Sequence, residues 1–375
     1  MQSLTLTPRA ILIDVIPPTM TKKMAERRLL ELDSLTQTYG GIVVVELIQK
    51  RATPDYHTYI GSGKIEDLIE IAKAEKVRLV IVNNLLKPKQ MFELGEILRK
   101  HDIHVWDRID LILKIFAKHA KTAEAKLQIK LAAIDHMGPR IFGMGMELMQ
   151  QAGGIGGRGG QGESNTEIMK RHLRGQADHI RKQLDRQAIS RQGHRARRDR
   201  VGLKTVSIVG YTNAGKSSLL NALTHKGAYV ANQLFATLDT RIGELWLPEP
   251  KASILLSDTI GFIQDLPPQL ISAFRSTLDE TVDADLLLHV IDVNDPYLHE
   301  KIAEVEGILS QLKVEDTEKI YVFNKIDLKK RLPIASLKKR YKKFRPIFVS
   351  AHTKAGLDEL KQALTEQFFP TKKNS

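Results

Sequence analysis

The stretch SIVGYTNAGKSSLLNAL, residues 207–223, joins an apolar strand to an amphipathic helix through a loop bounded by glycines. It contains the pattern G-x-x-x-x-G-K-S, formed by Gly210, Gly215, Lys216 and Ser217. In this pattern the loop amides and the helix N-terminus bind phosphate oxygens, the lysine reaches the β- and γ-phosphates, and the hydroxyl ligates Mg²⁺. Because the strand and the helix stand where this chemistry needs them, the stretch predicts a P-loop nucleotide site in an α/β domain.

A second segment supplies the expected contacts to Mg²⁺ and the γ-phosphate. ILLSDTIGF, residues 254–262, is a hydrophobic strand that ends at Asp258. An aspartate there can hold the Mg²⁺ shell through water, while the amide of Gly261 faces the γ-phosphate. Phe262 follows and cannot orient water by hydrogen bonding; Gln264 is a weak substitute. We therefore expect slow intrinsic hydrolysis of the nucleotide, accelerated by a partner that orders the switch segments around the γ-phosphate.

Two later segments indicate the base. IYVFNKID is a strand that ends in Asn324, Lys325 and Asp327. A carboxylate here can accept from guanine N1–H and the 2-amino group, a donor pair that adenine lacks. PIFVSAHTKAG places Ser350 and Ala351 at a further strand end, where a backbone amide can bind guanine O6. Since all these segments lie at carboxyl ends of strands, where open α/β sheets bind ligands, they predict one site for a guanine nucleotide.

The composition narrows the classes of protein. The chain has no cysteine, which excludes disulfides and cysteine-based metal sites and fits a reducing cytoplasm. Its apolar runs are well below the ~18 residues of a membrane span, so we expect a cytoplasmic protein without stable membrane insertion. The net charge of +13 favours nucleic acid or another anionic partner.

The chain before the P-loop predicts two further domains. In residues 1–115, strands at 10–16, 41–48, 78–83 and 103–107 alternate with helices at 20–39, 64–76 and 87–101. This alternation predicts an α/β domain with a parallel or mixed sheet covered on both faces. Its "IGSGK" turn has no P-loop serine or threonine after Lys64, so we interpret it as a tight turn into a helix.

Residues 116–196 predict a long antiparallel helical hairpin, before a Ras-like P-loop GTPase domain at 201–370. Leu127, Leu131 and Ile134 form an apolar stripe at i, i+4, i+7, on a helix expected to end at Met-Gly-Pro, residues 137–139. A second, basic helix is expected to begin near Glu167 and to give way to a linker at 192–204. Two long helices joined by a loop form an antiparallel pair.

The tip and the second helix of this hairpin carry the charge. The tip, GGIGGRGGQGESN at 153–165, has seven glycines but no P-loop lysine. Residues 166–200 hold eleven Lys/Arg and four Asp/Glu, a net +7. One interpretation is a solvated helix face; the other is a surface that follows an RNA backbone, with Arg158 at the tip. The candidate RNA-binding residues are Arg158, Lys170, Arg171, Arg174, Arg181 and Lys182.

Several segments resemble known families. Residues 201–366 resemble a Ras-type GTPase domain of the translation-factor class. The glycine-rich tip, YIGSGK, FAKHAKTAEAKLQ, LFATLD and DTIGF together resemble the HflX family over nearly the whole chain. That resemblance implies a GTPase that binds the large ribosomal subunit and its rRNA, splits or rescues stalled or idle ribosomes, and places the hairpin toward the peptidyl-transferase centre. We expect a monomer off the ribosome.

The resemblance also assigns the first switch and a cation. NQLFATLDT, residues 232–240, resembles the first switch, in which Thr237, with Thr240 as runner-up, completes Mg²⁺ coordination. GYTNAGKSS resembles the loop of potassium-activated GTPases, where an asparagine at the place of Asn213 helps to hold K⁺. The other interpretation is that Asn213 only shapes the loop.

Motifs and resemblance together give the expected site. Catalysis is assigned to Lys216, Thr237 and Gly261, and Mg²⁺ coordination to Ser217, Thr237 and Asp258. The expected nucleotide contacts are Gly210, Tyr211, Thr212, Asn213, Ala214, Gly215, Lys216, Ser217, Ser218, Phe235, Ala236, Thr237, Leu238, Asp239, Asp258, Thr259, Ile260, Gly261, Asn324, Lys325, Ile326, Asp327, Ser350, Ala351 and His352.

Two other functions stay open at this point. One is an RNA-remodelling, helicase-like NTPase that uses ATP in its N-terminal domain, which the atypical IGSGK turn disfavours. The other is a non-catalytic ribosome-binding regulator, in which hydrolysis is incidental.

Overall fold

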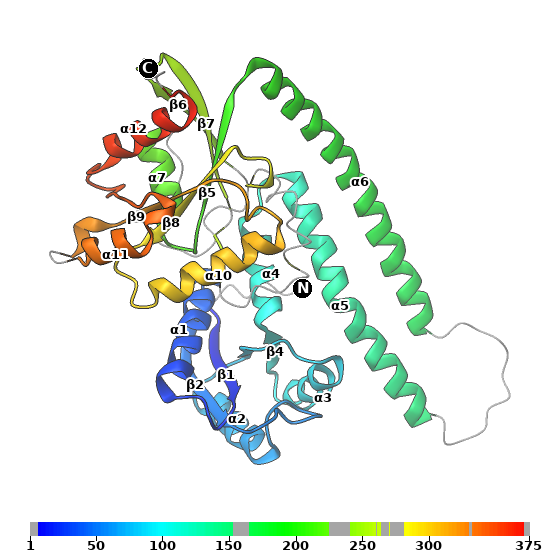
Figure 1. Ribbon diagram of the computed structural model, residues 1–375. Coiled ribbons are helices and arrows are strands. Elements are labelled where there is room, and N and C mark those ends of the chain that lie inside the picture. The colour runs from blue at the N-terminus through cyan, green and yellow to red at the C-terminus, as the bar shows by residue number, and fades with distance from the viewer. Residues whose placement is uncertain are drawn as a thin grey trace. The chain divides into compact units, whose positions relative to one another are not determined.

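The computed structural model describes residues 7–152, 165–224, 241–259, 261–263, 270, 281–329 and 332–370 (Figure 1). The chain divides into two compact units. The N-terminal unit comprises Met1–Lys118 and Lys126–Leu184, and the C-terminal unit comprises His119–Ala125 and Asp185–Ser375. The residues expected to form the hairpin are thus shared between the two units. Among the described residues, every helix is too short or too polar to cross a membrane.

A parallel four-stranded sheet forms the centre of the N-terminal unit. Its strands are β1 (Arg9–Ile16), β2 (Ile42–Lys50), β3 (Leu79–Val82) and β4 (His104–Asp107), in the order β2-β1-β3-β4. They are connected by α1 (Lys22–Tyr39), α2 (Ser62–Ala74) and α3 (Pro88–Arg99). Nearly all of β1 and all of β3 are buried, as expected for parallel strands covered on both faces. The predicted α/β alternation is confirmed.

The IGSGK segment is a turn into a helix, as predicted. Gly61 is the N-cap of α2, and its N–H donates to Oε1 of Gln49 over 3.0 Å. Lys64 donates to Asp67 one turn further along the same helix, over 3.1 Å. The lysine that resembled a P-loop lysine is therefore paired with a carboxylate of its own helix.

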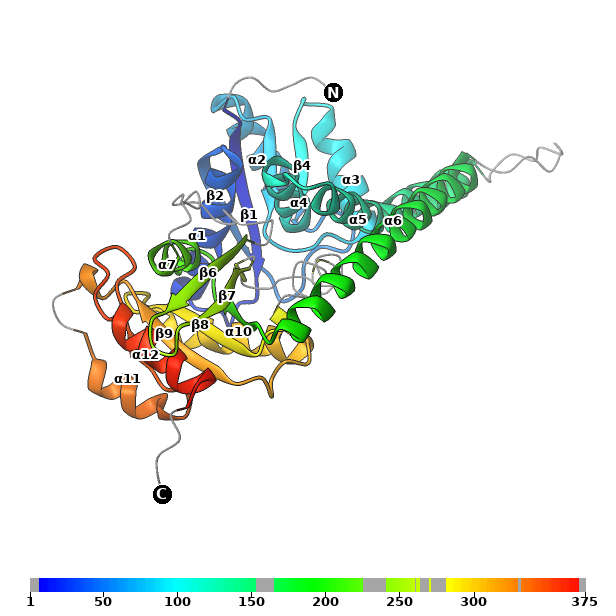
Figure 2. The same cartoon turned by 90° about the horizontal axis from the view of Figure 1, so that it is seen from above.

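Three helices follow: α4 (Arg108–His119), α5 (Ala123–Ala152) and α6 (Asn165–Val201). The last two lie side by side and run antiparallel in both views (Figures 1 and 2). They are joined by ion pairs between Arg181 and Asp135, at 3.3 Å, and between Arg191 and Glu124. The predicted antiparallel pair of helices is therefore present.

Two predicted helix ends were wrong. Helix α5 continues through the Met-Gly-Pro segment to Ala152, although Pro139 removes one helical hydrogen bond. His136 and Arg140, on either side of this proline, are bonded to Asp107 at the end of β4 and to Asp110 in the first turn of α4, and these contacts support the helical conformation there. Helix α6 likewise extends to Val201, because most of the expected linker consists of good helix formers such as Arg, Gln and Ala.

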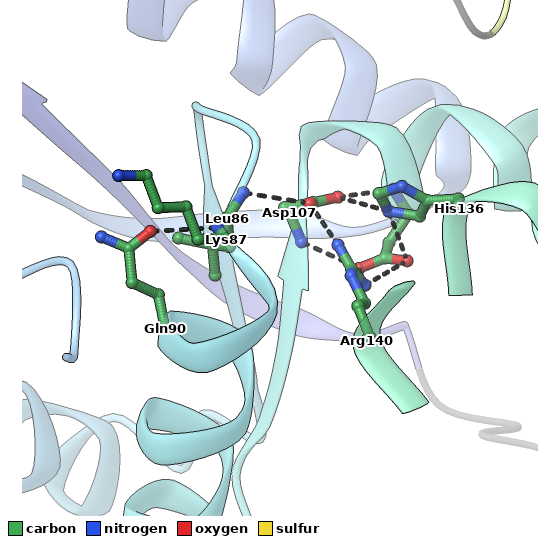
Figure 3. A network of polar contacts seen from close by, with 7 residues as sticks. Leu86, Lys87, Gln90, Asp107, His136 and Arg140 are labelled. Carbon is green, nitrogen blue, oxygen red and sulfur yellow. Dashed lines mark hydrogen bonds and ion pairs between the residues drawn. The ribbon is translucent and has the colours of Figure 1, made fainter. Parts of the chain in front are cut away.

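A polar network connects α5 to the start of α4 (Figure 3). The N–H of Asp110 donates to Asp107 over 2.9 Å, and the N–H of Asp107 donates to Asp110 over 3.1 Å. This reciprocal pair caps the helix. Arg140 donates to both carboxylates, and Nε2 of His136 lies 3.3 Å from Asp107 and 3.4 Å from Asp110. Asp107, Asp110 and His136 are close enough together to hold a metal ion, but Arg140 already supplies positive charge there.

Charge balance in this network depends on His136. Burial opposes protonation of the imidazole, but its hydrogen bonds to Asp107 and Asp110 outweigh burial and raise the pKa of His136. Burial also opposes ionisation of Asp110, yet hydrogen bonding from His136 and the charge of Arg140 lower its pKa to about 2. The raised pKa of His136 favours the protonated imidazole, which then shares with Arg140 the neutralisation of the two carboxylates.

The C-terminal unit is built on a six-stranded sheet. Its strands are β5 (Lys204–Val209), β6 (Arg241–Leu247), β7 (Ala252–Asp258), β8 (Leu286–Asp292), β9 (Lys319–Asn324) and β10 (Ile347–Phe348), in the order β10-β9-β8-β5-β7-β6. Only the β6–β7 pair is antiparallel among these pairings. The helices described in this unit after α6 are α7 (Lys216–Leu223), α10 (Leu298–Gln311), α11 (Ile334–Arg340) and α12 (Leu357–Phe368), with 3₁₀ turns η1 (Ile326–Leu328) and η2 (Lys342–Phe344).

Replacing Arg140 with methionine tests the network. The change leaves two carboxylates, one of them fully buried, without their guanidinium, and we expect a loss of roughly 3–5 kcal/mol in the stability of the N-terminal unit. Arg181→Met is the matched control, because its pair with Asp135 is about half exposed and contributes about 0–1 kcal/mol. Urea unfolding measures both changes. Equal losses in the two variants would contradict the assignment.

The raised pKa of His136 predicts a pH dependence. A raised folded-state pKa stabilises the protein fully below the unfolded value, about 6.5, and this contribution is lost as pH rises through the folded-state pKa. The stability difference between the parent and His136→Gln should therefore be largest near pH 6 and decrease toward pH 9. Thermal unfolding across this range measures it, with exposed His101→Gln as the control. A difference that does not vary with pH would disprove the charged state.

Candidate nucleotide-binding site

Two glycines allow the phosphate loop to lie directly against β8 and the end of β9. Gly210 has φ +146°, and a β-carbon there would lie 2.3 Å from the carbonyl oxygen of Val290. Gly215 has φ +94°, and a β-carbon there would lie 2.3 Å from Nδ2 of Asn324. Both positions combine a backbone conformation that favours glycine with a contact too close for any side chain. The loop therefore requires both glycines of the motif.

The ammonium group of Lys216 is buried inside the loop. Its Nζ donates to the carbonyl oxygens of Gly210, at 3.2 Å, and of Tyr211, at 2.9 Å. Burial lowers the pKa of Lys216 to about 8; the charge of Asp258 opposes this shift and that of Lys325 adds to it. A cation held away from water by neutral carbonyls is favourably placed to bind an anion.

Ser217 and Asp258 meet at the carboxyl ends of two paired strands. Ile208 of β5 is in register with Asp258 of β7, and the Ser217 hydroxyl donates to Oδ2 of this fully buried aspartate over 2.5 Å. A hydroxyl and a carboxylate are oxygen ligands of the kind that Mg²⁺ prefers. The Thr212 hydroxyl lies nearby, buried and without a hydrogen-bond partner among the described residues. These donors fit a magnesium-bound phosphate.

Gly261 and Phe262 lie against the phosphate loop. A β-carbon on Gly261 would be 2.8 Å from Nζ of Lys216, so its backbone lies beside the ammonium group. The N–H of Phe262 donates to Gly210, and its carbonyl accepts from the N–H of Thr212. The Phe262 ring is 1% exposed and packs in an apolar cluster. It offers no group that could orient water.

Asn324 connects the phosphate loop to the segment after β10. Its Nδ2 donates to the carbonyl of Ala214 over 3.0 Å, and its Oδ1 accepts from the N–H of Ala351 over 3.0 Å. Ser350 is buried, and its hydroxyl accepts from the N–H of Thr353. The two segments expected to contact opposite ends of the nucleotide are thus joined through one side chain.

The sequence analysis did not identify Asp292 and Asn294, two residues that hold the loop after β9. Lys325 has a left-handed backbone, with φ 66°, and its Nζ donates to the Asn213 carbonyl and to Asp292, both over 2.7 Å. Asn294 donates through its amide to the Lys325 carbonyl over 2.7 Å, and its N–H donates to Asp292 over 2.9 Å. The signal was present in the sequence, because VIDVND also ends a strand at the ligand-binding edge.

The other expected contacts fall into three groups. Asp327, in η1, and His352 are exposed at this edge, and the N–H of Ile326 donates to Val349. Thr259 is buried and its hydroxyl donates to Ile208, while Ser218 is half-buried in α7. The residues outside the described part of the chain are Arg158, Phe235, Ala236, Thr237, Leu238, Asp239, Thr240, Ile260 and Gln264.

The basic residues expected to bind RNA lie on α6. Arg171, Arg174 and Lys182 are exposed, as is Arg181, which pairs with Asp178 and Asp135; Lys170 is half-buried. A groove of about 560 Å³ runs beside this helix. Its lining consists of Lys130, Ile168, Arg171, His172, Gly175, Gln176, His179 and Ile180.

Three family models match successive parts of the chain. A model described as GTP-binding GTPase N-terminal matches residues 26–117, one described as GTP-binding GTPase Middle Region matches 119–198, and one described as 50S ribosome-binding GTPase matches 205–325. Among solved structures, a GTP-binding protein from Sulfolobus solfataricus in complex with GDP has a TM-score of 0.52 at 24% identity, covering 96% of this chain and 99% of that one. This likeness shows a shared fold.

Sequence relatives define the family. GTPase HflX of Caldanaerobacter subterraneus subsp. tengcongensis is 42% identical over 361 residues, which are 96% of this chain and 81% of that protein. GTPase HflX of Escherichia coli is 37% identical over 337 residues, 90% of this chain and 78% of that protein. Since both exceed 30% identity over most of each chain, the resemblance expected from the motifs is confirmed, and this chain belongs to the HflX family of GTPases.

Proposed function

We propose that this protein is a GTP-controlled factor of the large ribosomal subunit that splits or rescues stalled or idle ribosomes. One observation carries the proposal: Asn324 bonds both the phosphate loop and the Ala351 segment, so the motifs for phosphate and for guanine form one connected site. The likeness of residues 205–325 to a 50S ribosome-binding GTPase supports the choice of partner. Such a role places the protein in the cytoplasm, as a monomer when off the ribosome.

Each residue at the phosphate end has a part in this proposal. Lys216 would turn from the carbonyls of Gly210 and Tyr211 toward the β- and γ-phosphates, and the Gly261 amide would face the γ-phosphate. Ser217 and Asp258, together with Thr237, would hold Mg²⁺. The ion, when bound, neutralises charge on the phosphate oxygens.

The base end accounts for nucleotide choice and for the rate. Asp327, exposed beside the Asn324 loop, would accept from guanine N1–H and the 2-amino group. The buried ring of Phe262 leaves the attacking water without a hydrogen-bonding guide, so hydrolysis is slow until a partner orders the switches. Asn213, exposed in the loop, is proposed to help hold K⁺; GTPase rates in K⁺ and in Na⁺ at equal ionic strength test that role.

The hairpin is the proposed rRNA-binding element. Arg171, Arg174 and Lys182 present exposed charge along α6, and the groove beside them is lined by further basic and imidazole groups. Phosphate contacts of this kind bind structured RNA by shape and backbone. ATP-driven remodelling is disfavoured, because Lys64 is bonded to Asp67 and the IGSGK turn caps a helix.

Co-sedimentation with ribosomal particles tests the proposed function. We expect the protein to pellet with 50S and 70S particles in a nonhydrolysable GTP analogue, to be released in GDP, and to leave 30S particles unbound. Lys216→Ala should lose the dependence on nucleotide, because the phosphates lose their buried cation. Ribosome binding that is identical in GTP and GDP would refute nucleotide control. Complete splitting of 70S ribosomes in the nonhydrolysable GTP analogue would favour the alternative of a ribosome-binding regulator in which hydrolysis is incidental.

The pair formed by Asp292 and Lys325 predicts a slow release of nucleotide. Asp292→Asn weakens the charge-assisted hydrogen bond from Lys325, which holds the loop after β9 in place. We therefore expect GDP to dissociate about tenfold faster. Stopped-flow release of fluorescent GDP measures the rate. The matched control is Asp285→Asn, since Asp285 immediately precedes the amino-terminal end of the same strand and bonds Thr205 and Lys204. Equal rates in both variants would remove Asp292 from the positioning role.

A further inference from the structure

A run of basic residues extends from the end of α11 (Figure 1) through η2 to Arg345, two positions before β10. Residues 338–345 read KKRYKKFR, six lysines and arginines in eight positions. The sequence holds no aspartate or glutamate between Asp327 and Asp358. We call the α11 basic patch the six residues Lys338, Lys339, Arg340, Lys342, Lys343 and Arg345.

Apolar neighbours fix the backbone of this patch. Leu337 and Tyr341 are buried in the C-terminal unit, and the Phe344 ring stacks on Tyr321 with centroids 4.3 Å apart. All six basic residues are exposed. The patch is therefore a fixed scaffold that displays charge, and its apolar side chains are used for packing.

Among the described residues, the basic groups of the α11 basic patch form no ion pair with a carboxylate. In the part of the chain that the structure describes, no carboxylate lies within ion-pair distance of any of the six. Arg345 donates to the amide oxygen of Gln367 over 3.3 Å. On α6, by contrast, Arg181 and Arg191 both pair with carboxylates. Six adjacent like charges repel one another, and an anionic partner would relieve that repulsion.

The patch lies away from the nucleotide site. The turn η2 leads into the amino-terminal end of β10, whereas Ser350 and Ala351 follow its carboxyl end. A groove of about 570 Å³ is lined by Lys338, Lys342 and Arg345 of the patch and, on the α12 side, by Glu359 and Glu366. Those carboxylates repel an anion inside the groove, so a polyanion fits on the exposed basic rim.

We propose that the α11 basic patch binds the phosphate backbone of double-stranded RNA. Repeated phosphates match several fixed cations at once. A membrane surface fits less well, because Leu337 and Tyr341, which flank the basic residues, are buried in the C-terminal unit and cannot insert into lipid. Single-stranded RNA fits less well, because the rings of Tyr341 and Phe344 are packed and unavailable for stacking on bases. The inference rests on charge and exposure and does not depend on the proposed function.

The test is a salt titration of binding to a labelled RNA duplex of about 20 base pairs, with the full-length protein. In the triple variant Lys339→Gln, Lys342→Gln, Lys343→Gln we expect affinity to fall about tenfold or more at low salt. The slope of log affinity against log salt should decrease in magnitude by about two to three, because each phosphate that is no longer neutralised lowers it by roughly 0.9. Arginine at the same three positions should restore both values.

A second triple variant controls for net charge. Lys100, Lys251 and Lys313 are exposed lysines outside the patch, and replacing all three with glutamine should change neither affinity nor slope by a comparable amount. Fluorescent GDP binding should be unchanged in every variant, so failure of the nucleotide site would be seen separately. Equal RNA affinity and slope in the two glutamine triples would overturn the proposal. Patch-dependent binding to phosphatidylserine vesicles without patch-dependent RNA binding would also overturn it.

Discussion

The side chain of Asn324 is the constraint on which the nucleotide site depends. It is 1% exposed, and its amide group bonds the phosphate loop on one side and the segment after β10 on the other. The loop can come this close only because position 215 is glycine. One buried amide therefore sets the distance between the two ends of the proposed nucleotide. Lys325, held by Asp292 and Asn294, extends this connection to the carbonyl of Asn213.

The same site contains a cation that is costly to bury. Lys216 bonds two carbonyl oxygens, and burial lowers its pKa to about 8. Phosphate oxygens would supply the negative charge that the carbonyls lack, so a bound nucleotide should stabilise the C-terminal unit as well as occupy it. In this arrangement part of the binding energy offsets the cost of the buried ammonium group. The phosphate loop is therefore suited to binding an anion. Because Asn324 bonds this loop to the segment after β10, contacts to the phosphates and to the base should depend on each other.

The sequence identified those site residues whose type and spacing are dictated by the chemistry of phosphate binding. The P-loop glycines, Lys216 and the strand ends at Asp258 and Asn324 were found because spacing and strand position determine them. Asp292 and Asn294 were missed because their role depends on where the Lys325 side chain lies, which no local pattern shows. The end of α5 was misplaced because proline propensity is local, whereas the contacts of Arg140 come from the start of α4.

Net charge shows a similar limit of sequence reasoning. A count of basic and acidic residues made α6 the first candidate for a polyanion-binding surface. Such a count does not distinguish basic groups that are paired with carboxylates from those that are not. Arg181 and Arg191 are bonded to carboxylates of the same hairpin, whereas the α11 basic patch has no such partners among the described residues. Attraction to a nucleic acid grows with the number of phosphates that are neutralised, and a cation already paired contributes less to that number. Arg181 and Arg191 should therefore contribute less to the binding of a polyanion than exposed basic residues without a carboxylate partner.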